Sequence, residues 1–95
     1  MLSFNPKVQS DLKAVIRYYD AISEALGDEF FAEFNYYVEV IRRSPTRFPF
    51  SDEPYRKVML KKFPYAIAYK TVGSHSRILV LKHKRRRQYY GLSRK

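Results

Sequence analysis

Cysteine is absent from this sequence, and only two histidines occur among its 95 residues. Without cysteine, the chain can build neither a disulfide framework nor a thiolate zinc site. The same absence suits a reducing compartment, so we expect a cytoplasmic protein. Two histidines alone make a poor ligand set, and we therefore predict no metal and no other cofactor.

Long hydrophobic runs are also missing. The uninterrupted apolar runs are only a few residues long, whereas a membrane helix needs about 20 residues. The chain opens without a basic-then-apolar leader, so we do not expect secretion. Its composition, 45% hydrophobic and 17% aromatic, is that of a folded protein rather than a disordered one. We predict a single domain over residues 1–95 with one modest core.

Acidic residues are missing from the second half of the chain, where none follows Glu53. Residues 54–95 carry thirteen Lys and Arg, whereas residues 1–53 carry six against nine acids, a net charge of −3. This one-sided clustering exceeds what solubility requires. A basic half of this kind favours nucleic acid or an acidic protein as its partner.

Apolar residues recur every three or four positions in the first half, which predicts two amphipathic helices, over residues 6–26 and 28–43. Asn5 is the expected N-cap of the first helix, with Pro6 at its first position. Gly27 is expected to end that helix, and Asp28 to cap the next one. Because the link is so short, the two helices must form an antiparallel hairpin.

The second half reads as strands. Residues 44–55 hold three prolines and predict a loop. Alternating and apolar runs then predict strands over 56–63, 65–72 and 77–83, after a short strand near Leu2–Phe4. We therefore predict an α+β fold, in which an N-terminal short strand and an antiparallel helical hairpin pack on one face of a small antiparallel sheet. The expected core consists of Leu12, Ile16, Tyr19, Phe34, Val38, Ile41, Leu60, Ile67, Val80 and Leu81.

Four segments, in this order, resemble the RelE/ParE superfamily of bacterial toxins. They are Phe4-Asn5-Pro6…Tyr19, Pro45…Phe48-Pro49, Arg56…Phe63-Pro64-Tyr65-Ala66-Ile67-Ala68-Tyr69 and Ile78…His83-Lys84-Arg85-Arg86. The resemblance implies the toxin of a type II toxin–antitoxin module, of the plasmid-stabilisation kind, that an acidic antitoxin holds inactive. Members of the family block growth either by cutting messenger RNA on the ribosome or by poisoning DNA gyrase.

Both mechanisms stay open for this chain. Ribosome-dependent members usually carry basic residues at strand positions where this sequence has Met59 and Ala66. The basic and aromatic end of the chain, residues 85–90, keeps RNA cleavage open as a mechanism. Outside the family, the alternative is a non-catalytic basic RNA-binding module.

The basic end supplies the candidate catalytic residues. Cleavage of RNA by its own 2′-hydroxyl needs proton transfer and positive charge on the phosphorane. His83 has the right ordinary pKa for proton transfer, and Arg85 and Arg86 suit bidentate binding of phosphate. Tyr89 or Tyr90 suits stacking on a base or donating a proton. The competing interpretation is structural: a hydrogen-bonding strand end, a solvated or antitoxin-binding tail, and packing against the sheet.

Further cations are predicted to bind nucleic acid or the antitoxin: Lys57, Lys61, Lys62, Arg77, Lys82 and Arg87. If the helices cover one face of the sheet, several of these must reach the other face or its rim. With Tyr65 and Tyr69 nearby, that face would combine cations and aromatic rings, the usual mixture for single-stranded nucleic acid.

Overall fold

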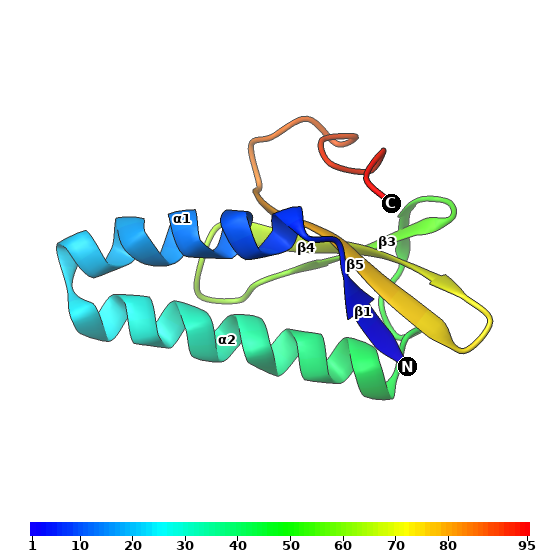
Figure 1. Ribbon diagram of the computed structural model, residues 1–95, viewed down its shortest axis with the longest axis horizontal. Helices are drawn as coiled ribbons and strands as arrows, with labels where there is room; N and C mark the ends of the chain where they lie inside the picture. The colour runs from blue at the N-terminus through cyan, green and yellow to red at the C-terminus, as the bar shows by residue number, and fades with distance from the viewer.

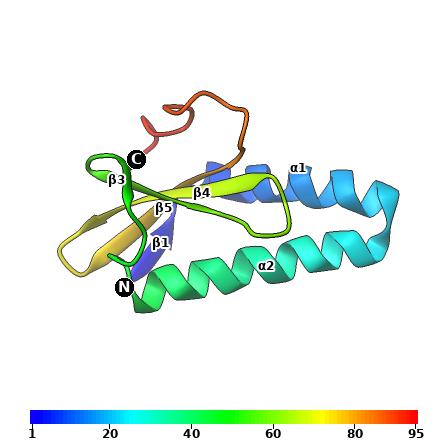
Figure 2. The ribbon, with the colours of Figure 1, turned by 180° about the vertical axis from the view of Figure 1, so that it is seen from behind.

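The computed structural model describes residues 1–95 and has the predicted α+β architecture (Figure 1). Two helices and five strands follow one another as β1 (Leu2–Phe4), α1 (Lys7–Ile22), α2 (Glu24–Arg43), β2 (Phe50–Asp52), β3 (Tyr55–Met59), β4 (Tyr65–Val72) and β5 (His75–His83). The strands form one sheet in the order β1-β5-β4-β3-β2. In both overall views α2 lies against one face of the sheet, the last residues of the chain cover the other face, and α1 runs alongside (Figures 1 and 2). Neither helix is long and apolar enough to cross a membrane.

The sheet is mixed rather than purely antiparallel. β3, β4 and β5 pair antiparallel as predicted, and β2 adds antiparallel to β3. β1, in contrast, pairs parallel with β5, with Leu2 opposite Ser76 and Phe4 opposite Ile78. The long helical connection after β1 permits this parallel pairing, which a tight turn does not. β1 pairs with β5 only as far as Phe4, so the outer edge of the second half of β5 has no strand beside it.

Several boundaries differ from the predictions, although β4 matches its predicted range of 65–72. β2 lies within the proline-rich segment that we expected to be a loop, and it forms an edge strand against β3. β3 ends at Met59 rather than at residue 63, because Leu60 and Phe63 turn into the core. β5 begins two residues before the expected residue 77.

The break between the helices is at Ser23 and not at Gly27. Gly27 lies inside α2 and is buried where α1 passes; a β-carbon there would overlap the Asp20 carboxylate. The glycine therefore lies where the two helices approach each other, beside the exposed Asp20 side chain, and the sequence pattern did not distinguish this position from a helix stop. The start of α1 is capped as predicted, since the Asn5 side-chain oxygen accepts a hydrogen bond from the Lys7 N–H (2.9 Å).

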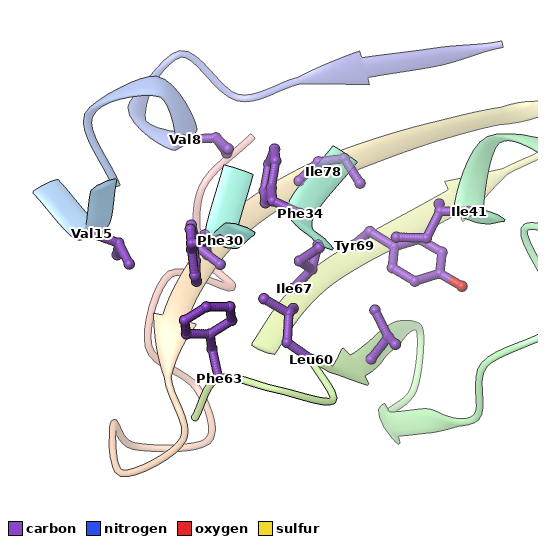
Figure 3. Close-up of a cluster of buried hydrophobic side chains, with 12 residues drawn as sticks. Val8, Val15, Phe30, Phe34, Ile41, Leu60, Phe63, Ile67, Tyr69 and Ile78 are labelled. Carbon is purple, nitrogen blue, oxygen red and sulfur yellow. The ribbon is translucent and has the colours of Figure 1, made fainter. Parts of the chain in front are cut away.

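The main core lies between the hairpin and one face of the sheet (Figure 3). Its buried side chains come from both helices, from β3 to β5 and from the β3–β4 loop. Tyr69 is fully buried there, and its hydroxyl donates a hydrogen bond to the Pro45 carbonyl oxygen (2.7 Å). Nine of the ten predicted core residues belong to this cluster or pack against it: Leu12, Ile16, Tyr19, Phe34, Val38, Ile41, Leu60, Ile67 and Leu81. Val80 is buried on the opposite face instead.

We call residues 84–95 the tail. They fold back over the face of the sheet that the helices leave uncovered (Figures 1 and 2). Leu92 is buried there against Ala68 and Val80. Gly91 has a φ of 80° and passes so close to Val80 that a β-carbon would lie 2.6 Å from the Val80 Cβ. Glycine is needed at this position for both reasons.

Candidate functional site

A groove of about 390 Å³ runs between α1 and the end of β5, where the tail begins. Four of the residues predicted for catalysis or binding line it, namely Lys82, His83, Arg86 and Tyr90. Tyr65 and four residues of α1 that were not predicted, Ser10, Asp11, Ala14 and Tyr18, complete most of its wall. The groove thus brings together a histidine, an arginine and three tyrosines from parts of the chain that are far apart in the sequence.

His83 stands at the last position of β5, opposite Tyr65 of β4. Its Nδ1 accepts a hydrogen bond from the Arg85 N–H (3.1 Å), and its ring meets the Tyr65 ring edge-on at 5.1 Å. Because Nδ1 is occupied as an acceptor, the proton of the neutral ring belongs on Nε2. The local fold therefore prepares His83 to donate a hydrogen bond from Nε2.

Arg86 is the exposed cation of the groove. Its guanidinium lies over the Tyr90 ring at 4.7 Å from the centroid, a cation–π arrangement that fixes its direction. Its backbone N–H donates to the His83 carbonyl oxygen (3.0 Å), which keeps the two residues together. No carboxylate pairs with Arg86. An anion entering the groove therefore meets a guanidinium whose hydrogen bonds are not committed to an acid.

Asp11 is the carboxylate of the groove, and it is fully engaged. It forms an ion pair with Arg94 of the tail (2.7 Å), in which the two side chains are 14% and 13% exposed. The same carboxylate accepts a hydrogen bond from the Leu81 N–H (3.2 Å), and Arg94 donates to the Leu79 carbonyl oxygen (3.1 Å). Asp11 and Arg94 thus satisfy backbone groups on the part of β5 that β1 leaves unpaired, and no free carboxylate remains to act as a base.

Lys82, predicted to bind nucleic acid or the antitoxin, is 5% exposed. Its ammonium donates hydrogen bonds to three tail carbonyl oxygens, those of Arg87 (3.3 Å), Gln88 (2.6 Å) and Tyr90 (3.3 Å). Burial, with a smaller effect from nearby Lys57, lowers the pKa of Lys82 below the ordinary lysine value. The structure therefore gives this side chain internal partners.

The other candidates of the tail lie outside the groove. Arg85, Arg87 and Tyr89 are exposed and do not line it. Arg77 is at the far end of β5, where its guanidinium donates to Ser3 Oγ (3.0 Å) and to the Lys95 carbonyl oxygen (3.1 Å). These contacts hold β1 and the end of the tail together.

The remaining predicted cations are spread over the molecule. Lys61 and Lys62 lie in the β3–β4 loop beside α2, where the Lys62 N–H donates to the Glu33 carboxylate (3.2 Å). Lys57 lies half-buried on β3. The expected cationic and aromatic face of the sheet does not form, because Tyr65 and Tyr69 pack against the helical hairpin and the tail covers the other face.

Two groove residues that were not predicted, Tyr18 and Asp11, differ in how far the sequence could have identified them. Tyr18 was detectable, because it is a large aromatic residue beside Tyr19 but outside the apolar stripe of its helix, and it is 61% exposed. Asp11 gave no such signal. Its partner Arg94 is 83 residues away, and a sequence pattern does not show which exposed acid meets the tail.

No protein-family model matches the sequence, and no curated protein matches it. Among solved structures, the chain is similar to one from the chromosomal ParDE TA system from P. aeruginosa. The two share 17% sequence identity with a TM-score of 0.75, over 86% of this chain and 92% of that chain. At this identity the likeness concerns the fold, and it confirms the predicted RelE/ParE-like fold.

Proposed function

We propose that this protein is the toxin of a type II toxin–antitoxin module, which inhibits bacterial growth in the cytoplasm until an acidic antitoxin neutralises it. The observation that carries the proposal is the groove in which His83, Arg86 and Tyr90 meet. The likeness in fold to a chain of a ParDE system supports it. So does the charge of the chain, since residues 54–95 hold thirteen basic residues and no acid.

The groove suits messenger RNA as the target. The Arg86 guanidinium offers paired donors to a phosphate, and the exposed Tyr18 ring offers a stacking surface to an unstacked base. In the reaction we propose, the 2′-hydroxyl gives its proton to a water molecule and its oxygen forms a bond to phosphorus, while the bond to the 5′-oxygen breaks. His83, as the imidazolium, gives its Nε2 proton to the leaving oxygen and becomes neutral, and Arg86 stabilises the charge on the phosphorane. The products are a 2′,3′-cyclic phosphate and a 5′-hydroxyl.

Binding to DNA gyrase is the second candidate, and a specific observation favours it. Met59 and Ala66 are paired across β3 and β4, at positions where ribosome-dependent members of the resembled family carry basic residues. Met59 is exposed and Ala66 is buried, so neither position offers a cation to RNA. A toxin that acts by binding gyrase needs no proton transfer, and its activity would not depend on His83.

The antitoxin follows from the charge. An acidic segment complements the basic half and the exposed cations of the tail. We expect nanomolar or tighter binding, with association slowing as salt rises while the apolar part of the interface holds. Co-purification with an acidic protein encoded beside this one tests the expectation, and failure of that pair to associate contradicts it.

The decisive experiment is induction of the wild type and of tail variants in bacteria. Arg86→Ala should abolish growth arrest without changing the circular dichroism spectrum, and Arg86→Lys should rescue only weakly, because lysine lacks the paired donors. Arg85→Ala is the matched control: it removes the same charge one residue away and outside the groove, so we expect a smaller loss. Undiminished arrest by Arg86→Ala refutes the groove as the functional site.

The same cultures distinguish the two targets. If messenger RNA is cut, amino-acid incorporation falls before DNA supercoiling does, and RNA fragments end in cyclic phosphates. If gyrase is the target, supercoiling fails first. A folded wild-type protein that does not arrest growth when induced alone contradicts the toxin proposal itself.

A further inference from the structure

The tail has few means of holding its own shape around the groove. Its local hydrogen bonds are isolated turns, such as those from Arg86 N to His83 O, from Tyr90 N to Arg87 O and from Leu92 N to Tyr89 O. Four consecutive cations, residues 84–87, repel one another at its start. A short segment of this kind does not order itself in water.

Lys82 supplies a contact from outside the segment. Its ammonium has three protons, and three carbonyl oxygens of residues 87, 88 and 90 surround it. The neutral amine has only two protons, so the charged form alone satisfies all three acceptors. Each of these bonds joins a strand of the rigid sheet to the backbone that carries the groove residues.

The position of this contact matters for the groove. The three carbonyls flank Tyr90, whose ring lies under the Arg86 guanidinium. Displacement of that backbone would move the Tyr90 ring and remove the surface against which Arg86 is placed. The tail has other anchors on both sides of Tyr90. The Lys84 N–H donates to the Pro64 carbonyl oxygen (2.8 Å), and Gln88 Nε2 donates to the Ser51 carbonyl oxygen (2.9 Å). Further along, Leu92 is buried on the sheet, Arg94 pairs with Asp11, and the Lys95 carbonyl accepts a hydrogen bond from Asn5.

We propose that Lys82 is a positioning residue, which fixes the turn of residues 87–90 so that Arg86 and Tyr90 stand beside His83. It does not reach an entering ligand itself, because its ammonium is enclosed by tail carbonyls. This inference rests on the proposed function for the meaning of the groove. The placement of the tail, however, is measurable without any assay of function.

The first test is limited proteolysis with trypsin, whose cleavage sites include the basic run at residues 84–87. Lys82→Met keeps the aliphatic stem and removes the three donors. We expect cleavage in that run to be about tenfold faster or more, since a hydrogen bond from a charged group is typically worth that factor. Lys70→Met is the matched control, because Lys70 lies on the same sheet near Tyr55 and forms no hydrogen bond to the tail. Equal cleavage rates in Lys82→Met and the wild type overturn the proposal.

The second test asks whether Lys82 acts through Arg86. The probe is a single-stranded RNA with 2′-O-methyl groups, which binds but is not cut. If Lys82 only positions Arg86, then Lys82→Met and Arg86→Ala each weaken binding by about tenfold, and the double variant is no weaker than either. If the two fold-losses in RNA affinity multiply in the double variant, the proposal is overturned, because Lys82 then contributes to binding independently of Arg86. Lys82→Arg, which keeps a cation with several donors, should restore part of the binding.

A third measurement uses the wild type and does not depend on the folding of any variant. In nuclear magnetic resonance spectra of protein labelled with the isotope nitrogen-15 in lysine and carbon-13 in its carbonyls, the Lys82 ammonium protons should exchange slowly with water. They should also show scalar coupling across the hydrogen bond to a tail carbonyl carbon. Rapid exchange, as for the exposed lysines, overturns the proposal. If the wild type binds no RNA and arrests no growth, the proposed function fails, while the proteolysis and exchange results still decide the role of Lys82.

Discussion

The two faces of the sheet are held by different forces. The face toward the helical hairpin buries a cluster of twelve residues, whereas the tail face buries a cluster of only three, Ala68, Val80 and Leu92. The other contacts that hold the tail are mostly polar. They include the Lys82 ammonium on tail carbonyls, the pair of Asp11 with Arg94, and hydrogen bonds of Gln88 and Lys95. The difference shows that the stability of the fold and the position of the tail depend on different contacts. One face supplies most of the free energy of folding, and the other holds a thin segment in one position over it.

Substitution of His83 should give the largest effect, a loss of activity without a loss of folding stability. His83→Gln keeps an oxygen that can accept the Arg85 N–H but removes the proton donor. If the protein cleaves RNA, the cleavage rate should fall on the order of 10²–10⁴-fold, while the melting temperature changes little. A single-turnover assay on ribosome-bound messenger RNA measures the rate. An unchanged rate excludes His83 as the proton donor, and undiminished growth arrest favours the gyrase mechanism.

The next effect concerns packing on the two faces. Ile67→Ala should lower the free energy of unfolding by about 2–5 kcal/mol, because it opens a cavity in a core that cannot close around it. Leu92→Ala should cost less, under about 2 kcal/mol, since the tail can detach from the sheet instead of keeping a cavity. Urea titration of both variants measures the difference. Equal losses would show that the tail is part of the main cooperative unit.

Two glycines provide a matched pair for backbone placement. Gly91→Ala combines a positive φ with a clash against the Val80 side chain, so it should cost about 1–3 kcal/mol of tail docking. Gly27→Ala should be neutral or stabilising by up to about 1 kcal/mol, because the Asp20 side chain can swing aside and alanine favours a helix. Hydrogen exchange of the tail and thermal unfolding report the two effects. Unchanged tail protection in Gly91→Ala contradicts this account.

The smallest expected effect is a pH dependence of folding stability, which comes from a buried tyrosine on the helix-covered face. Burial raises the pKa of Tyr69 above its ordinary value of 10.0. The folded state therefore holds this proton more tightly than the unfolded state, and the stabilisation is present below about pH 10 and lost as the pH rises through the raised pKa. Tyr69→Phe should flatten this alkaline slope, at a cost of about 1 kcal/mol at neutral pH for the lost hydrogen bond to Pro45. Urea titrations at neutral and alkaline pH measure both; an unchanged slope contradicts the prediction.

How far the sequence predicts this molecule depends on the range of the interactions involved. The helical hairpin, β4 and the core of the helix-covered face follow from local periodicity, because residues such as Phe34 and Ile67 repeat at the spacing of their own element. The helix break was placed at Gly27 because a glycine that ends a helix and one that permits close packing look alike in sequence. The parallel pairing of β1 depends on where the chain returns after the hairpin.

The groove was predictable in its basic half and not in its remainder. His83, Arg86 and Tyr90 are near one another in the sequence, and their chemistry identified them. The structural roles of Asp11 and Lys82 could not be predicted, because their partners in the tail reach them only when the tail folds back over the sheet. The sequence displays Lys82 as one more cation of a basic run.

The contact of Lys82 has a consequence for how the protein can change during evolution. Its acceptors are backbone carbonyls, which every amino acid has, proline included. Residues 87 and 89 can therefore be exchanged without loss of this contact, whereas Gln88 also holds the tail through its side chain, which donates to the Ser51 carbonyl oxygen (2.9 Å). A library that randomises positions 87 and 89 should retain many ordered tails with altered exposed side chains. A lineage built on this scaffold can thus change these side chains one mutation at a time, while the backbone that presents them stays constant.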